Sequence, residues 1–264
     1  MRTRLRRAAI GVATLVVTTA VAASGQASAH ANQQASIPTA VQSSGSSIVG
    51  VIFRPGSDDQ VCTATVINSH TQNLVLTAAH CLTGSGAGWR FAPDYHSGKA
   101  PLGTWTATGA YALPGWLSGQ DPQEDMAILK IAPQTIAGKQ RTLQSVTGAA
   151  DIGLAPATGQ SITDIAYNNG SGEPIACTTQ VYWTGSSTSF DCHGYIGGSS
   201  GSPWLVATDA NPRVVGVIGG LNQGGCEEST SYSSAFGNNI ISLWLHAEGS
   251  PDGDVLPAAG SSGC

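Results

Sequence analysis

The sequence predicts an all-β fold, and three observations support that prediction. First, the chain of 264 residues has 34 glycines and only 10% charged residues, a composition that suits short strands joined by tight turns. Second, β-rich runs alternate with turn-forming segments through most of the chain. Third, only one segment, late in the chain, has convincing helical periodicity. The length allows one large β domain or two small lobes.

The predicted strands fall into three groups. The first contains "IVGVIF", "CTATVI" and "NLVLTAA", separated by the turn-rich segments "RPGSDDQ" and "NSHTQ". The second is "DMAILKIA", a strand with partial alternation of apolar and polar residues. In the third, "PIACTTQVYW" and "STSFDC" flank Thr184-Gly185-Ser186, which predicts a hairpin, and "RVVGVIGGL" has the apolar run of a buried strand.

The predicted helix covers "NNIISLWLHAEG", residues 238–249. Its apolar residues recur at helical spacing, Asn238 or Asn239 can cap the first turn, and Gly249 can end the last turn. The tail at 250–264 is rich in Pro, Gly and Ser, which is typical of disorder. Because it contains Cys264, we expect this tail to be tied to the rest of the domain.

The first 46 residues divide into two expected segments. Four arginines precede an apolar run, and Ala27-Ser28-Ala29 forms a small-x-small cleavage pattern, so residues 1–29 are predicted to be a signal peptide. The alternative is a membrane anchor, but the unbroken apolar run is shorter than the ~20 residues that a span needs. Residues 30–46 are small and polar, which predicts a short pro-segment or a flexible arm. We therefore expect a secreted, extracellular protein with its main domain at 47–249.

The charge argues against two kinds of partner. The formal net charge is −5, and it becomes −9 once a signal peptide with four arginines and no acidic residue is removed. The chain has only three lysines, at positions 99, 130 and 139. Without a basic face, we expect no binding to nucleic acid and none to a membrane surface.

Six cysteines predict three disulfides, because an even number in an exported chain is typical of a disulfide framework. They are Cys62, Cys81, Cys177, Cys192, Cys226 and Cys264. A zinc site is the alternative, but no pair has the C-x-x-C or H-x-x-x-H spacing of such sites. We expect neither a metal nor a cofactor.

The stretch "GGSSGSPW" holds two adjacent serines, Ser199 and Ser200, either of which is a candidate nucleophile. A serine hydroxyl reacts at neutral pH only when a base contacts it and an acid orients that base. His80 is the best placed of six histidines, because it follows a predicted strand and precedes a cysteine. Asp125 is the best placed acid, because a carboxylate at the head of an apolar strand needs a partner for its charge. Its rivals are the nearby acids at 121 and 124.

Three motifs resemble those of the trypsin/chymotrypsin-like serine proteases. "LTAAHC" (76–81), "DMAILK" (125–130) and "GSSGSP" (198–203) supply His, Asp and Ser in the family order, with separations of 45 and 75 residues. The resemblance covers residues 48–248 and includes the final helix. It implies two six-stranded antiparallel β-barrels with the catalytic residues in the cleft between them. It also implies a secreted, monomeric serine endopeptidase that acts on proteins or peptides without a cofactor.

The same resemblance assigns roles to individual residues. Ser200 matches the nucleophile, because Gly, a small residue and Pro follow it, whereas Ser199 does not match. His80 is then the general base and Asp125 the acid that orients it. The backbone N–H groups of Gly198 and Ser200 would form the oxyanion hole.

The substrate pocket is implied less fully. Gly219, Gly220 and Leu221 would form one pocket wall and the edge that pairs with substrate backbone. The "GSSGSP" ending resembles the bacterial glutamyl-endopeptidase-like branch, which often uses a histidine in this strand to hold an acidic side chain. Here "VGVIGGLN" contains no histidine, so the specificity stays open. Ser199 stands where digestive members have Asp, so we expect the nucleophile loop to be ordered by its own packing rather than by a newly freed terminus at Ile48.

The disulfide pairing is partly implied by the family and partly left open. Cys62–Cys81 matches the family bridge beside the catalytic histidine. For the other four cysteines, we prefer Cys177–Cys192 across the predicted hairpin and Cys226–Cys264 at the tail. The rival arrangement joins Cys192 to Cys226 and Cys177 to Cys264.

Two other functions fit parts of the sequence. Residues 197–201 match the G-x-S-x-G elbow of α/β-hydrolases, with Ser199 as nucleophile and Asp209 and His246 following in the required order. The alternating strands and helices of that fold are absent from the sequence pattern, which argues against an esterase. A catalytically silent binding protein is the second alternative, and the presence of all three reactive residues argues against it.

Overall fold

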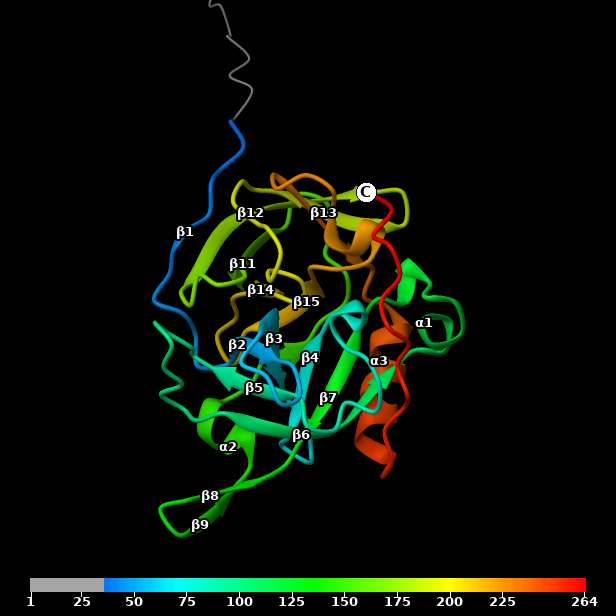
Figure 1. Cartoon of the computed structure of the whole chain (residues 1–264). Helices are drawn as coiled ribbons and strands as arrows, with labels where there is room; N and C mark the ends of the chain where they lie inside the picture. Colours follow the sequence, from blue (N-terminus) through cyan, green and yellow to red (C-terminus); the bar gives the residue numbers. More distant parts are fainter. Residues whose placement is uncertain (1–35) are drawn as a thin grey trace, which may run out of the picture. The chain divides into compact units, whose positions relative to one another are not determined.

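The computed structural model describes residues 36–264 (Figure 1). The predicted signal peptide and the first part of the predicted arm lie outside the described residues. Within residues 36–264 the secondary structure is mostly β, as the composition and the strand pattern predicted. The strands form two principal groups, which we call the first and the second lobe.

The first lobe is a closed six-stranded barrel with the order β2-β3-β4-β7-β6-β5. Every neighbouring pair is antiparallel. Its strands are β2 (Val49–Phe53), β3 (Gln60–Ile67), β4 (Leu74–Thr77), β5 (Arg90–Pro93), β6 (Trp105–Ala112) and β7 (Ala127–Ile131). β2 and β4 are buried along their whole length, which explains their continuous apolar sequences. Closure requires Gly50, where a Cβ would collide with the carbonyl of Ala92 on β5.

The second lobe is an eight-stranded sheet, not the closed six-stranded barrel that was predicted. Its main path is β10-β15-β14-β11-β12-β13-β16, and β1 pairs with β12 outside this path. The strands are β1 (Val41–Gln42), β10 (Asp151–Ile152), β11 (Ser161–Tyr167), β12 (Pro174–Thr184), β13 (Ser187–Asp191), β14 (Pro203–Val206), β15 (Arg213–Val217) and β16 (Thr230–Ser234). β12 and β13 form the predicted hairpin, in which Thr184 pairs with Ser187.

A side-chain hydroxyl explains why β15 and β16 approach each other without forming a ladder. The N–H of Val217 donates to Ser233 Oγ at 3.1 Å, a donor that a ladder would otherwise use. Just beyond β15, the N–H of Gly219 donates to the carbonyl of Tyr232 at 2.9 Å. One edge of β15 pairs antiparallel with β14, and β10 pairs in parallel with the start of the edge that β16 approaches further along. The second lobe therefore departs from the barrel pattern at contacts that the strand sequences do not encode.

Residues 38–43, within the segment predicted to be a pro-segment or a flexible arm, form backbone hydrogen bonds with the second lobe. Val41 pairs with Ala176 on β12. The N–H of Ala40 donates to the carbonyl of His193, and the N–H of His193 donates to the carbonyl of Pro38, both at 2.8 Å. Polar composition did not reveal this arrangement, because backbone pairing at a strand edge needs no apolar side chain.

The shorter elements connect the strands and cover the first lobe. They are α1 (Pro114–Gly119), α2 (Leu143–Thr147), the hairpin of β8 (Gln134–Ile136) and β9 (Lys139–Arg141), and the 3₁₀ turns η1 (Ala79–Cys81), η2 (Pro122–Glu124) and η3 (Leu221–Gly224). Helix α3 (Asn238–Gly249) occupies the segment in which a helix was expected, and it packs on β6 and β7 through Ile240, Leu243 and Ala247. In the described part of the chain, no helix combines the length and apolarity needed to cross a membrane.

Three disulfides join the cysteines in the preferred arrangement. They are Cys62–Cys81 in the first lobe, Cys177–Cys192 within the second lobe and Cys226–Cys264 at the tail. The second of these spans the β12–β13 hairpin, whose strands bring the two cysteines to facing ends. The third ties residues 250–264 to the loop that follows η3.

Candidate active site

The fold brings His80 and Asp125 together because the strands next to them in the sequence are neighbours. His80 lies in η1, just after β4, and Asp125 lies just before β7. β4 and β7 pair antiparallel, with Thr77 opposite Ala127, so the end of one strand meets the start of the other. A separation of 45 residues in sequence becomes direct contact.

Asp125 accepts three hydrogen bonds in a fully buried position. Its Oδ2 lies 2.7 Å from Nδ1 of His80 and 2.8 Å from the N–H of Gly220, and its Oδ1 accepts from the N–H of His80 at 2.9 Å. Burial raises the pKa of the Asp125 carboxyl, but the charge of His80 and these hydrogen bonds outweigh burial and hold that pKa below its usual value. Asp125 is therefore an ionised group that fixes the orientation of the His80 ring. Its rivals face elsewhere: Asp121 caps η2 and Glu124 bonds the N–H of Gly115.

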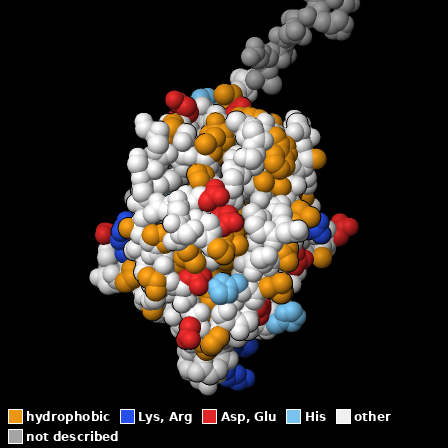
Figure 2. Space-filling view, turned by 90° about the vertical axis from the view of Figure 1, so that its right-hand side faces the viewer, with side chains coloured by type: hydrophobic (Ala, Val, Ile, Leu, Met, Phe, Trp, Pro, Cys, Tyr) orange, Lys and Arg blue, Asp and Glu red, His pale blue; other side chains and the backbone are white. Residues whose placement is uncertain are grey.

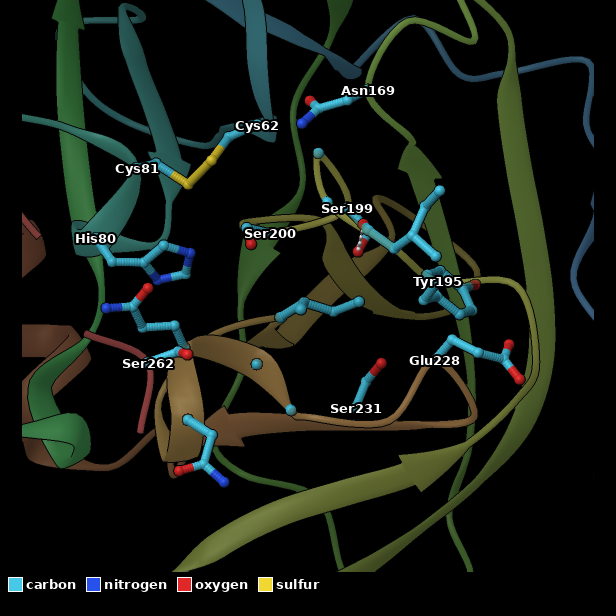
Figure 3. Close-up of a pocket in the computed structure, with 18 of the residues that line it drawn as sticks. Cys62, His80, Cys81, Asn169, Tyr195, Ser199, Ser200, Glu228, Ser231 and Ser262 are labelled. Atoms are coloured by element: carbon cyan, nitrogen blue, oxygen red, sulfur yellow. Dashed lines mark hydrogen bonds between the residues drawn. A yellow bond between two sulfur atoms is a disulfide. The ribbon is translucent and has the colours of Figure 1, made fainter. Parts of the chain in front are cut away.

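Ser200 lies between the lobes, in the loop that joins β13 to β14. Its carbonyl accepts from the N–H of Thr63 in the first lobe at 2.8 Å. The N–H of the next residue, Gly201, donates to the carbonyl of Ile218 in the second lobe at 2.7 Å. The imidazole of His80 points toward Ser200 (Figure 3). The three residues predicted from the motifs are thus brought to one place.

The backbone around Ser200 exposes two donors of the kind predicted for an oxyanion hole. Among residues 36–264, no protein acceptor takes a hydrogen bond from the N–H of Gly198 or from that of Ser200. Gly198 has a φ of 98°, and a Cβ there would collide with the backbone nitrogen of Asn169. The N–H of Asn169 in turn donates to the carbonyl of Gly197 at 2.7 Å, which holds the turn in place.

Ser199 points away from this arrangement. Its side chain is buried, and its hydroxyl donates to the carbonyl of Ile196 at 2.8 Å (Figure 3). The hydroxyl thus stabilises the loop from within, in the position where digestive relatives were expected to carry a carboxylate. His246, the base in the esterase alternative, contacts Asp254 and Ser250 beside α3. Together with the antiparallel strands, these contacts argue against the G-x-S-x-G interpretation.

A cavity of about 490 Å³ opens beside Ser200 and His80. Only four of its lining residues belong to ionisable types that carry or acquire charge near neutrality: Arg54, His80, Glu227 and Glu228. Glu228 is already engaged, since His193 Nδ1 and the N–H of Gly194 both lie 2.5 Å from its carboxylate oxygens. Ile218 lines the cavity, and His80 is its one lining histidine among the described residues. The pocket is therefore mainly neutral.

The predicted pocket wall lies next to Asp125 rather than in the lining of this cavity. Gly219, Gly220 and Leu221 do not line the cavity. The N–H groups of the two glycines are taken by the carbonyl of Tyr232 and by Asp125, so they cannot pair with a substrate. The chain then turns into η3 instead of staying extended, because Asn222 and Gln223 are left-handed, with φ of 52° and 53°. The lining residues that sequence reasoning missed include Tyr195, Ile218, Asn222, Gln223, Gly224, Gly225, Ser231 and Ser262.

Sequence reasoning also missed Asp164 on β11, whose carboxyl group is buried. Ser202 Oγ lies 3.0 and 2.9 Å from its two oxygens. Burial raises the pKa of Asp164 well above its usual value, and the hydrogen bonds from Ser202 and Tyr195 offset this only in part. The Asp164 carboxyl thus ties Ser202, two places after the candidate nucleophile, to the second lobe. The sequence signal that could have identified Asp164 is its place in "SITDIAY", where strand alternation puts it on the same buried face as Ile162.

One cluster in the described part of the chain has the proximity of a metal site. Ligand atoms of Cys62, His80 and Cys81 lie within 4.8 Å of one another. The two cysteines are joined to each other, and a disulfide sulfur is not the thiolate that a metal requires. The Cys62–Cys81 disulfide therefore anchors the η1 turn that carries His80 to strand β3.

The fold and the site define the class of a serine protease hydrolase, and a comparison with protein families agrees. The family described as "Trypsin-like peptidase domain" matches residues 62–217, more than half of the chain. The chain therefore belongs to the trypsin-like peptidase family. The family resemblance inferred from the three motifs is confirmed.

Solved structures show the same fold. The crystal structure of the protease Anisep from Arthrobacter nicotinovorans is 27% identical and has a TM-score of 0.65, covering 79% of this chain and 99% of that one. The structure of a Glu endopeptidase in complex with MPD is 18% identical, with a TM-score of 0.63 and coverages of 81% and 98%, and it shows the fold alone.

A curated relative matches over a shorter region. It is the "Extracellular metalloprotease" of Bacillus subtilis (strain 168), 31% identical over 74 residues, which are 26% of this chain. This chain spans only about a quarter (23%) of the length of that relative.

Proposed function

We propose that this protein is a secreted serine endopeptidase that cleaves peptide bonds through an acyl-enzyme. Ser200 is the nucleophile, His80 the general base and Asp125 the acid that orients the base. One observation carries the proposal: Asp125 holds Nδ1 of His80 at 2.7 Å while the ring points toward Ser200. A proton fixed on Nδ1 leaves Nε2 as the basic nitrogen.

The proposed reaction begins with attack of Ser200 Oγ on the scissile carbonyl carbon, while Nε2 of His80 accepts the hydroxyl proton. The carbonyl oxygen becomes an oxyanion that the N–H groups of Gly198 and Ser200 bind. The C–N bond then breaks, and His80 gives its proton to the leaving amine. Water hydrolyses the resulting ester by the same steps, which restores Ser200.

Electrostatics supports this assignment. Asp125 is ionised and buried, so it stabilises the imidazolium that forms when His80 takes the proton. The two oxyanion donors need no rearrangement, because the turn at Gly198 already aims them away from protein acceptors. One such donor contributes a factor of about 10² to 10³ to kcat in related chemistry.

Secretion is part of the same proposal. All six cysteines are joined in disulfides, which persist in oxidising compartments. The curated relative is described as extracellular. The predicted signal peptide at 1–29 would direct the export.

The face in Figure 2 shows lysine and arginine only at its margins, which supports a peptide rather than a nucleic acid as substrate.

A fluorophosphonate probe tests the assignment, because it reacts with an activated serine. We expect the probe to label the wild-type protein and the Ser199→Ala variant but not Ser200→Ala. Ser199→Ala is the matched control, since it removes the neighbouring hydroxyl and its hydrogen bond to Ile196. Labelling of Ser200→Ala but not of Ser199→Ala would overturn the choice of nucleophile. An unlabelled, folded wild-type protein would indicate the binding-protein alternative.

A further inference from the structure

Residues 250–264 are bound to the domain along their whole length. The N–H of Asp254 donates to the carbonyl of Ala110 at 2.8 Å, and Leu256 forms an antiparallel bridge with Gly84 and is buried. The segment ends in the disulfide between Cys264 and Cys226. In Figure 1 it appears in red between α3 and the second lobe. It is therefore a fixed part of the domain, and we call residues 257–264 the strap.

The strap joins two sides of the active site through glutamine side chains. On one side, Gln120 lies between α1 and η2, five residues before Asp125. Its Nε2 donates to the carbonyl of Ala258 at 2.7 Å, and its Oε1 accepts from the N–H of Gly260 at 2.8 Å. On the other side, Gln223 in η3 donates to the carbonyl of Gly260 at 2.8 Å. The strap thus spans the gap between the loop that carries Asp125 and η3.

Beyond this bridge, the strap enters the active site itself. Ser262 lines the cavity together with His80 and Ser200, and Figure 3 shows it on the side of His80 that faces away from Cys62. Only 9% of the side-chain surface of His80 is exposed. Cys226, the anchor of the strap, also lines the cavity.

The position of the cavity beside Ser200 indicates which half of a substrate, the acyl half or the leaving-group half, lies next to the strap. The side chain of the residue before the scissile bond, P1, belongs to the acyl half, and the recess beside Ser200 that can accept it is lined by Ile218, Gly225 and Ser231. In the proposed mode of substrate binding, the residues that precede P1 run along η3, which lines the same cavity through Asn222, Gln223 and Gly224. The leaving group lies on the other side of Ser200, toward Cys62.

The leaving-group side is open. A second cavity of about 720 Å³ adjoins the first and shares Arg54, Val61 and Asn169 with it. Its other charged lining residues are Asp58 and Asp59. A substrate has room for several residues there, between the β2–β3 loop and the loop after β11.

The acyl side offers a substrate little free backbone. Pairing with an extended substrate requires N–H and C=O groups along an exposed edge. The N–H groups of Gly219 and Gly220 are engaged inside the protein, and η3 curls the next residues away from an extended path. Among residues 36–264 the N–H of Leu221 has no protein acceptor, whereas the side-chain amide of Gln223 is already occupied by the strap.

We propose that the strap is a specificity element that occupies the acyl-side subsites preceding P1, so that the substrate is selected by P1 and by its leaving-group side. This inference rests on the proposed serine protease function. The disulfide holds the strap at an effective concentration that, for short tethers, is on the order of millimolar. A substrate extended on its acyl side has to displace the strap before those residues can bind.

The test uses two variants of the full protein and two series of substrates. In the first variant residues 257–264 are deleted; in the second, Cys264→Ser, the strap is present but untethered. One series of peptide amides lengthens the acyl side from one to four residues with P1 and the leaving group unchanged. The other lengthens the leaving-group side. An N-acetyl amino acid ester carrying the same P1 reports the chemistry without either extension.

We expect the kcat/KM of the wild-type protein to change less than threefold along the acyl series and to rise along the leaving-group series. The deletion variant should gain at least tenfold along the acyl series. Cys264→Ser, which keeps Ser262 in the chain, should gain in the same direction by less, with ester hydrolysis within threefold of wild type. A wild-type gain of tenfold along the acyl series would overturn the proposal, as would no gain in a folded Cys264→Ser protein. If the wild-type protein neither hydrolyses the ester nor reacts with a fluorophosphonate, the proposed function fails instead.

Discussion

The substitution Asp125→Asn tests the chemistry most directly, because it keeps the shape of the side chain and changes only its charge and its donors. The carboxylate now accepts from three N–H groups, two from His80 and one from Gly220. An asparagine has one oxygen and one NH₂ group, so it cannot accept from all three. Either orientation places the amide nitrogen against a backbone donor.

The two orientations have different consequences for His80. If the amide oxygen stays near Nδ1, the NH₂ group faces the N–H of His80 and leaves a buried donor unsatisfied, at about 1 to 3 kcal/mol of folding stability. If the oxygen turns away, the NH₂ group donates to Nδ1, and the proton of the ring moves to Nε2. That tautomer cannot accept a proton from Ser200, and the same change in such a triad lowers kcat about 10⁴-fold.

The assay is the kcat for a small ester, measured together with the free energy of unfolding in urea. Asp121→Asn is the matched control, because Asp121 is exposed and bonds only the N–H of Gln123 at the start of η2. We expect the control to retain activity within a few fold. The pKa of Asp125 is held below its usual value, so its contribution to stability is present above the unfolded-state pKa and is lost as the pH falls through the folded-state pKa. The stability difference between wild type and Asp125→Asn should therefore shrink in acid. An Asp125→Asn protein with at least a tenth of the wild-type kcat would refute this role.

Three further predictions follow from other contacts. Burial raises the pKa of Asp164, so the folded state holds a proton that the unfolded state releases, and the free energy of unfolding falls as the pH rises. The midpoint temperature of thermal unfolding should therefore decline more steeply from pH 5 to pH 8 in wild type than in Asp164→Asn. Partial burial lowers the pKa of His96, but the hydrogen bonds that its ring donates to Glu173 and Asp94 raise this pKa overall. His96→Gln should therefore destabilise the protein by up to about 1 kcal/mol at pH 5.5 and by less at pH 8.5 in urea titrations. Gly198→Ala should lower kcat for the small ester at least tenfold, because the Cβ collides with Asn169 and displaces an oxyanion donor; unchanged kcat would argue against this donor pair.

The local patterns determined a large part of this protein. Short apolar runs broken by turn residues were sufficient to predict β2, β3, β4, β7, β12, β13 and β15, since side-chain burial and turn chemistry act over a few residues. Helix α3 could be predicted for the same reason, from the spacing of its apolar residues. His80, Asp125 and Ser200 could be singled out because each lies in a short motif next to a strand. The hairpin at Gly185 indicated the Cys177–Cys192 pair, because its two strands bring these cysteines together.

Only the tertiary structure decided the rest, because it depends on contacts between residues far apart in the chain. The second sheet stays open where Ser233 takes the N–H of Val217, a contact that no strand propensity encodes. The cavity lining after residue 221 depends on η3, in which two non-glycine residues adopt a left-handed backbone that the sequence alone does not favour. The strap lies across the site because Gln120 and Gly260 meet over a separation of 140 residues. Such a contact is set by the packing of both lobes, and neither short segment carries a signal for it.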